Sequence, residues 1–153
     1  MKKMILIFFV FAIFCTFESV FCQLKTYNFE QIDSLQQVQK RNIIVFTYTD
    51  WCKFCHAMKA QTLSNTKVIQ QLNENFYFIY LNADEKRTIV FNKSNYHFKS
   101  SGNNYGVHEL AIALATNNNQ INYPTLVILN YKNEILFQYS GFLNANNLLM
   151  LLK

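Results

Sequence analysis

The sequence is poor in the residues that build linkers, disulfide frameworks and strongly charged surfaces. Its 153 residues include one proline and three glycines, which argues for one domain without flexible linkers. The formal net charge is +5 and no cluster of lysines and arginines occurs, so we expect no nucleic-acid partner. In contrast, 51% of the residues are hydrophobic, and 15 phenylalanines and 9 tyrosines can supply the core of one domain.

The first 22 residues differ in composition from the rest of the chain. A short basic start precedes an almost wholly apolar run over residues 4–17, which is shorter than the roughly 20 residues of a membrane span. We predict a signal peptide over residues 1–22 and one domain over residues 23–153, exported to the periplasm or secreted. The alternatives are a retained membrane anchor and a lipid-modified Cys22. We expect contact with a membrane only through this segment, if it stays uncleaved.

Only Cys52 and Cys55 would remain in the exported domain, so it is not a scaffold held together by disulfides. The apolar run over residues 43–46 predicts a buried strand before the pair, and residues 57–60 open a helix after it. A first thiol at a helix N-terminus is favoured as a thiolate by the free N–H groups and the helix dipole. The second thiol, about one turn later, can attack a mixed disulfide formed by the first. Trp51 adds a flat, partly polar surface beside the sulfur.

Helical and strand patterns alternate along the remaining chain. The first two long strands flank a helix and should be parallel, whereas the last two are joined by a tight turn and should be antiparallel. We therefore predict an α/β fold with a mixed sheet and helices on both faces. The expected helices cover residues 29–41, the stretch from the cysteine pair to residue 61, a piece capped by Thr66, residues 107–114 and a segment ending at residue 152; the expected strands cover residues 43–48, 76–81, 126–129 and 135–139.

The segment over residues 85–105 gives a weaker pattern. Residues 88–98 indicate a small hairpin rich in aromatic side chains, and residues 100–104 indicate a loop. These aromatic side chains would either line a peptide-binding groove or pack along a sheet edge.

Three motifs together resemble the thioredoxin-like superfamily. They are the Trp-Cys-Lys-Phe-Cys run at residues 51–55 after the first central strand, Tyr-Pro-Thr at residues 123–125 before the third, and Gly141 after the last. The helix break after residue 61 makes the chain most similar to the thioredoxin-related proteins that bacteria export. The resemblance implies a thioredoxin-like fold over about residues 29–153, with a mixed central sheet flanked by helices and a small inserted segment before the cis-proline helix.

The resemblance also implies a thiol–disulfide oxidoreductase that acts on protein disulfides. Cys52 would be the attacking thiolate and Cys55 the resolving thiol. Pro124 would be the cis-proline that lies against the disulfide, and the backbone of Tyr123 would pair with an extended substrate. The implied partners are protein or peptide dithiols and disulfides, together with a redox partner protein. Nothing in the sequence calls for a bound cofactor or metal.

Some positions depart from the thioredoxin pattern. Phe46 stands where thioredoxins have a buried aspartate, and Tyr80 stands where they have its lysine partner. Lys53 and Phe54 replace the Gly-Pro dipeptide between the cysteines. The positive charge of Lys53 should favour the Cys52 thiolate, so we expect a Cys52 pKa below the free value of about 8.5.

His56 either acts on the Cys52 thiolate as Lys53 does or points away from it. With the cysteine pair, His56 also completes the C-x-x-C-H pattern of covalent haem attachment, but a preceding buried strand is not typical of such cytochromes. A zinc site would need two further ligands, and His97 and His108 show no ligand spacing and are expected at the surface.

A binding or chaperone module is the main alternative to an enzyme. In such a module the cysteine pair would be a static disulfide, and the groove beside Tyr123 and Pro124 would hold an extended partner by strand addition. Turnover of a disulfide substrate distinguishes the two functions.

Overall fold

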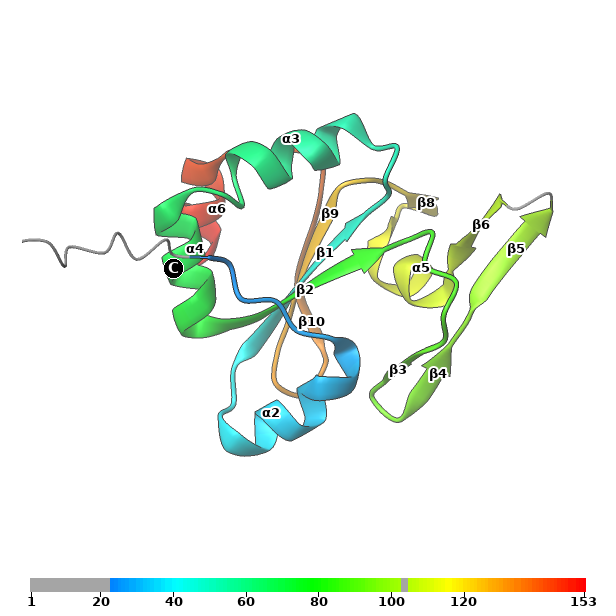
Figure 1. Cartoon of the computed structure of the whole chain (residues 1–153), viewed down its shortest axis with the longest axis horizontal. Coiled ribbons are helices and arrows are strands. Elements are labelled where there is room, and N and C mark those ends of the chain that lie inside the picture. The colour runs from blue at the N-terminus through cyan, green and yellow to red at the C-terminus, as the bar shows by residue number, and fades with distance from the viewer. Residues whose placement is uncertain (1–22, 103–104) are drawn as a thin grey trace, which may run out of the picture.

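The computed structural model of the protein describes residues 23–102 and 105–153. Its centre is a four-stranded sheet with the strand order β10-β9-β1-β2, and helices cover both faces (Figure 1). The sheet strands are β1 (Asn42–Tyr48), β2 (Phe76–Asn82), β9 (Thr125–Leu129) and β10 (Ile135–Ser140). The helices are a 3-10 turn η1 (Phe29–Gln31), α2 (Ile32–Val38), α3 (Lys53–Gln61), α4 (Thr66–Asn75), α5 (Glu109–Ala115) and α6 (Ala145–Leu151).

The strand directions agree with the sequence prediction. β1 runs parallel to β2, and β9 is antiparallel to both β1 and β10. β1 is an internal strand, as its apolar character on both faces predicts. The sheet is therefore mixed. The loop that carries the cysteine pair follows directly after the end of β1.

Two hydrophobic cores lie on the two faces of the sheet. Successive residues of β1 point to opposite faces, so Ile43 and Val45 join one core while Ile44 and Phe46 join the other. The first core contains residues of η1, α2 and α5, and the second contains residues of α3, α4 and α6. Both cysteines belong to the second core.

The predicted signal peptide, residues 1–22, lies outside the described residues. In the two described ranges, none of the helices has both the length and the apolar composition needed for a bilayer span.

The first predicted helix is shorter than expected. It ends at Val38, which is 88% exposed rather than packed on the sheet. The backbone turns to an extended conformation at Gln39. The Gln36 side chain then hydrogen bonds to both the amide and the carbonyl of Arg41, at 2.9 and 2.7 Å. This side chain satisfies backbone groups that another helical turn would have paired.

The cap of α4 is also one residue earlier than predicted. The side-chain oxygen of Asn65, not that of Thr66, accepts hydrogen bonds from the backbone amides of Lys67 and Val68. Asparagine is among the best N-cap residues, so the local chemistry explains the shift.

The inserted segment forms two hairpins. The predicted first hairpin is present as β3 (Ile89–Phe91) and β4 (Ser94–Tyr96). The predicted loop over residues 100–104 was wrong where the structure describes it, because Phe98–Gly102 forms β5 and pairs with β6 (Tyr105–His108). The next helix, α5, therefore begins at Glu109 rather than at Val107. A short hairpin of β7 (Thr116–Asn117) and β8 (Gln120–Ile121) follows it.

His108 is fully buried, contrary to the surface position expected from the sequence. Its Nδ1 accepts a hydrogen bond from the Leu110 amide and so caps α5, and its Nε2 donates to the Arg87 carbonyl oxygen, each at 3.2 Å. Its own backbone amide donates to the Ala83 carbonyl at 2.8 Å. His108 thereby ties the end of the second hairpin to the loop that follows β2.

Candidate active site

The cysteine pair lies at the N-terminus of α3, joined as a disulfide with Cα atoms 5.2 Å apart. Cys52 is the N-cap residue, and its Sγ accepts a hydrogen bond from the Cys55 amide at 3.1 Å. Both cysteines are buried, and Cys52, at 6% exposed, is the more accessible residue of the two, since Cys55 is 1% exposed. This is the strand-to-helix arrangement that the sequence predicts.

The Tyr123–Pro124 segment lies against the same loop. The peptide bond between these two residues is cis. The ring of Tyr123 meets that of Trp51 edge to face, with centroids 5.9 Å apart, and also packs against the core that contains both cysteines. Trp51, in contrast, is 70% exposed. The structure thus brings Trp51 and Tyr123 together beside the cysteine pair. The predicted contact of Pro124 with the disulfide stays a prediction.

Gly141 is hydrogen bonded to the proline segment. Its amide donates a hydrogen bond to the Pro124 carbonyl at 2.8 Å. Its φ of 125° lies in the region that favours glycine, which explains why this motif position carries no side chain.

The two residues predicted to modulate the cysteine pKa are both exposed at the start of α3. Lys53 follows Cys52 directly. The His56 ring is hydrogen bonded through Nε2 to the Asp50 carbonyl at 2.7 Å, so this nitrogen faces the loop before the cysteines. The effect of either side chain on Cys52 stays a prediction.

Phe46 and Tyr80 are direct neighbours across β1 and β2, and Lys59 of α3 approaches Tyr80 from the helix. The Lys59 ammonium lies 3.1 Å from the ring centroid of Tyr48 and 5.2 Å from that of Tyr80. Burial lowers the Lys59 pKa, although the Asp50 charge opposes this, and burial raises the pKa of Tyr80 to about 12.

Sequence reasoning missed this lysine. Its spacing of four residues from Cys55, which places both on one helix face, is the signal that could have found it. Cation–π contacts of this kind fasten α3 to the sheet.

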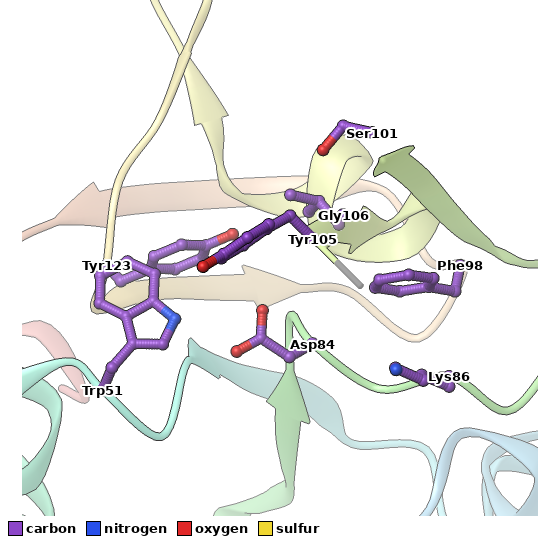
Figure 2. A pocket seen from close by; sticks show the side chains of 9 residues that line it. Trp51, Asp84, Lys86, Phe98, Ser101, Tyr105, Gly106 and Tyr123 are labelled. Carbon is purple, nitrogen blue, oxygen red and sulfur yellow. The ribbon is translucent and has the colours of Figure 1, made fainter. Parts of the chain in front are cut away.

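A cavity of about 620 Å³ opens beside the disulfide loop (Figure 2). Trp51 and Tyr123 line one side, Phe98 and Lys86 line the other, and Asp84 lies between them. The second hairpin also contributes Tyr105 to the lining.

The two hairpins use their aromatic residues differently. Phe91 of the first hairpin is buried and packs on Phe29, with ring centroids 5.0 Å apart. Phe98, at the start of the second, lines the cavity together with Tyr105. From the sequence we considered groove lining and packing along a sheet edge. Phe98 lines a cavity, whereas Phe91 packs in the core rather than along a sheet edge. Tyr105 and Asp84 were not identified from the sequence, since neither belongs to a recognisable motif.

Residues 29–153 match the family model described as a thioredoxin-like domain. The chain belongs to this family. The thioredoxin-like match covers the whole sheet, the cysteine pair and the proline segment, and so confirms the predicted superfamily and fold.

Solved structures show the same fold at low sequence identity. A Thermus thermophilus thioredoxin superposes with a TM-score of 0.60 at 20% identity, covering 85% of each chain. The oxidoreductase DsbH gives 0.54 at 14% identity, covering 78% of this thioredoxin-like chain and 74% of its own. The reduced C-terminal domain of Neisseria meningitidis DsbD gives 0.52 at 18% identity, with 80% and 89% covered. The sequence has no significant match among curated proteins.

Proposed function

We propose that this protein is a thiol–disulfide oxidoreductase that acts on protein disulfides. The observation that carries the proposal is the Cys52–Cys55 disulfide at the start of α3, in which the Cys52 sulfur accepts an amide hydrogen bond. The same environment would stabilise a negative charge on Cys52 after reduction. Membership of the thioredoxin-like family and the adjacent Tyr123–Pro124 segment support the same function.

The reaction is a reversible exchange of two electrons. In the reduced protein, the Cys52 thiolate attacks one sulfur of a substrate disulfide, which forms a mixed disulfide and releases the other sulfur as a thiolate. The Cys55 thiolate then attacks Cys52 Sγ, which restores the Cys52–Cys55 disulfide and releases the second substrate thiolate. The substrate gains two electrons and the protein loses two. A dithiol partner protein would reduce the enzyme again, and the reverse sequence would oxidise a substrate dithiol.

In this proposal Trp51, Tyr123 and Pro124 form the contact surface for the substrate, and Lys53 and His56 tune the reactive thiol. Export to the periplasm or secretion, directed by residues 1–22, would place the enzyme among disulfide-containing proteins.

Insulin reduction in the presence of a small dithiol tests the proposal. The wild-type protein should accelerate the reaction, and Cys52→Ser should abolish the acceleration. Cys55→Ser keeps the attacking thiol but removes the resolving one. Reduced Cys55→Ser, freed of the small dithiol and then incubated with insulin alone, should therefore accumulate a mixed disulfide that mass spectrometry detects. Cys52→Ser serves as the matched control and should trap nothing.

Failure of the wild-type protein to accelerate insulin reduction, with no trapped complex for Cys55→Ser, would instead support the static disulfide of a binding or chaperone module. The low exposure of both cysteine residues is the structural feature that favours this second function.

A further inference from the structure

The cavity beside the disulfide loop is lined by a carboxylate that has no hydrogen-bond or ion-pair partner among the described residues. Asp84 follows β2, and its backbone amide is held by the side chain of Asn82 at 3.0 Å. Its carboxylate, however, takes part in no hydrogen bond or ion pair with any residue in the described ranges. The side chain is half-buried and lines the cavity. An unpaired, partly desolvated negative charge favours a cation in contact with it.

Three aromatic side chains line the cavity near this carboxylate. Figure 2 shows Trp51 and Tyr123 on one side of Asp84, with the Tyr105 side chain extending across the cavity. Tyr105 is 76% exposed and is free to meet a bound group. The face of an aromatic ring attracts a cation through its quadrupole. Rings and carboxylate together therefore suit an ammonium or guanidinium group better than a purely apolar one.

The loop that carries Asp84 is fixed to the loop that carries the cysteine pair. The Asn82 side-chain amide donates to the Asp50 carboxylate at 3.1 Å, and the Ala83 amide donates to the Tyr48 carbonyl at 2.8 Å. Trp51, which lines the cavity, directly precedes Cys52. A polypeptide that reacts at Cys52 would therefore pass near the cavity, and a neighbouring side chain could enter it.

The other charged residue of the lining is Lys86. Its ammonium lies 5.8 Å from the ring centroid of Phe98, and both occupy the side of the cavity away from Trp51 (Figure 2). Its positive charge would repel a basic group on its own side. The cation site is therefore confined to the part of the cavity lined by Asp84, Trp51, Tyr123 and Tyr105.

We propose that this cavity binds a lysine or arginine side chain of the polypeptide whose disulfide reacts at Cys52. The inference rests on the proposed function and adds a substrate preference to it. The inserted second hairpin, which supplies Tyr105, would thereby act as a specificity element beside the cysteine pair of this thioredoxin-like chain.

Disulfide peptides that differ in one side chain test this preference. A lysine, a norleucine or a glutamate is placed in turn at each position on either side of the reactive cysteine, and kcat/KM for reduction is measured with the purified protein. At one or more positions the lysine peptide should react about tenfold faster than its norleucine partner, and the glutamate peptide more slowly than both.

Two variants assign the preference to the cavity. Asp84→Asn should bring the ratio of lysine to norleucine rates close to one, and Tyr105→Ala, at an exposed position, should reduce it. Glu85→Gln is the matched control, since it removes the same charge one residue away, from a side chain that pairs with Arg87 and does not line the cavity. It should leave the ratio unchanged.

Each failure has a separate meaning. Equal rates for all peptides would overturn the inference while leaving the oxidoreductase intact. Reduction of no peptide would overturn the proposed function itself. A lysine preference that survives both Asp84→Asn and Tyr105→Ala would show that the basic side chain binds elsewhere, and a glutamate preference would assign the binding to Lys86.

Discussion

The Cys52 sulfur combines two features that stabilise a thiolate. It caps α3, where the Cys55 amide donates to it, and the positively charged Lys53 is its neighbour in sequence. We predict that reduced Cys52 titrates below the free value of about 8.5, and that Lys53→Gln raises its pKa by a few tenths of a unit. Ultraviolet absorbance of the thiolate against pH measures both. Lys67→Gln, a similar change on α4, is the control, and an unshifted Cys52 would contradict the prediction.

Tyr123 carries a hydroxyl group that has no hydrogen-bond partner among the described residues. Burial, and then the charge of Asp84, raises the pKa of this phenol to about 12. Because an unpaired buried hydroxyl costs free energy, we predict that Tyr123→Phe raises the free energy of unfolding by about 1 kcal/mol.

Urea denaturation measures this change, and Tyr77→Phe provides a matched control. The Tyr77 hydroxyl donates to the carbonyl of Gln39 at 2.8 Å, so its loss should lower the free energy of unfolding by about 1 kcal/mol. Equal effects of the two substitutions would show that the Tyr123 hydroxyl is satisfied in solution.

At the scale of elements, His108 links α5 and the second hairpin to the end of β2. Its ring bonds the Leu110 amide and the Arg87 carbonyl, and burial lowers its pKa from the ordinary value. A base with a lowered folded pKa binds protons first in the unfolded state. We therefore predict that the contribution of His108 to the free energy of unfolding is constant above about pH 6.5 and that the free energy of unfolding falls as the pH drops below that value.

Substitution separates the capping role of His108 from its titration. His108→Asn retains an N-cap oxygen, whereas His108→Leu does not, so the leucine variant should be less stable by about 1 kcal/mol. Both variants should show a smaller loss of stability in acid than the wild type, measured by urea denaturation at several pH values. An unchanged acid dependence would mean that His108 is not the titrating group.

Strong local patterns made the central elements predictable. The apolar run of β1, the cysteine pair and the start of α3 follow one another in the chain, and each has a clear sequence pattern. The short turn before β10 predicts that β10 pairs with β9 in the antiparallel direction. The second hairpin was not predictable, because β5 contains serines, a lysine and a glycine and lies mostly exposed. Its position depends on tertiary contacts such as those of His108, which no local pattern reports.

The candidate site divides in the same way. Its cysteines and the Tyr123–Pro124 segment were predictable because they form motifs. Lys59 and Asp84 were not, because their roles come from neighbours on other strands and loops: the Tyr48 and Tyr80 rings for the lysine and the cavity wall for the aspartate.

At the scale of the whole molecule, stability should fall in strong alkali. The pKa of Tyr80 and that of Tyr123 are both raised to about 12, chiefly by burial, so the unfolded chain loses these protons first. The contribution of these two tyrosines to the free energy of unfolding is complete below about pH 10 and is lost as the pH rises toward 12. Burial lowers the Lys59 pKa, which acts in the opposite direction up to about pH 10.5.

We therefore predict a fall in the free energy of unfolding above about pH 10.5, where the lysine no longer compensates. Tyr80→Phe should make this fall smaller, whereas substitution of the exposed Tyr131 by phenylalanine should not. The urea concentration at the midpoint of unfolding, measured across this pH range, tests the prediction. A midpoint that does not change with pH in the wild type would contradict it.

The direction of electron flow depends on the reduction potential of the whole domain. A charge that stabilises the Cys52 thiolate acts on the reduced protein alone, because the disulfide is neutral, and so it makes the potential less negative. The start of α3 and Lys53 both act in this way, and the buried side chain of Phe46 adds no negative charge that would oppose a thiolate. We predict a potential less negative than the roughly −270 mV of thioredoxin.

Equilibration with glutathione buffers measures this potential. Lys53→Gln should shift it to a more negative value, in step with the rise in the Cys52 pKa, because both changes report the same loss of thiolate stabilisation. Lys67→Gln should leave it unchanged. A wild-type value near −120 mV would identify an oxidant of substrate dithiols, whereas a value at or below about −270 mV would contradict the prediction and indicate a reductant. A shift in the Cys52 pKa without a shift in potential would mean that the charge acts equally on both redox states.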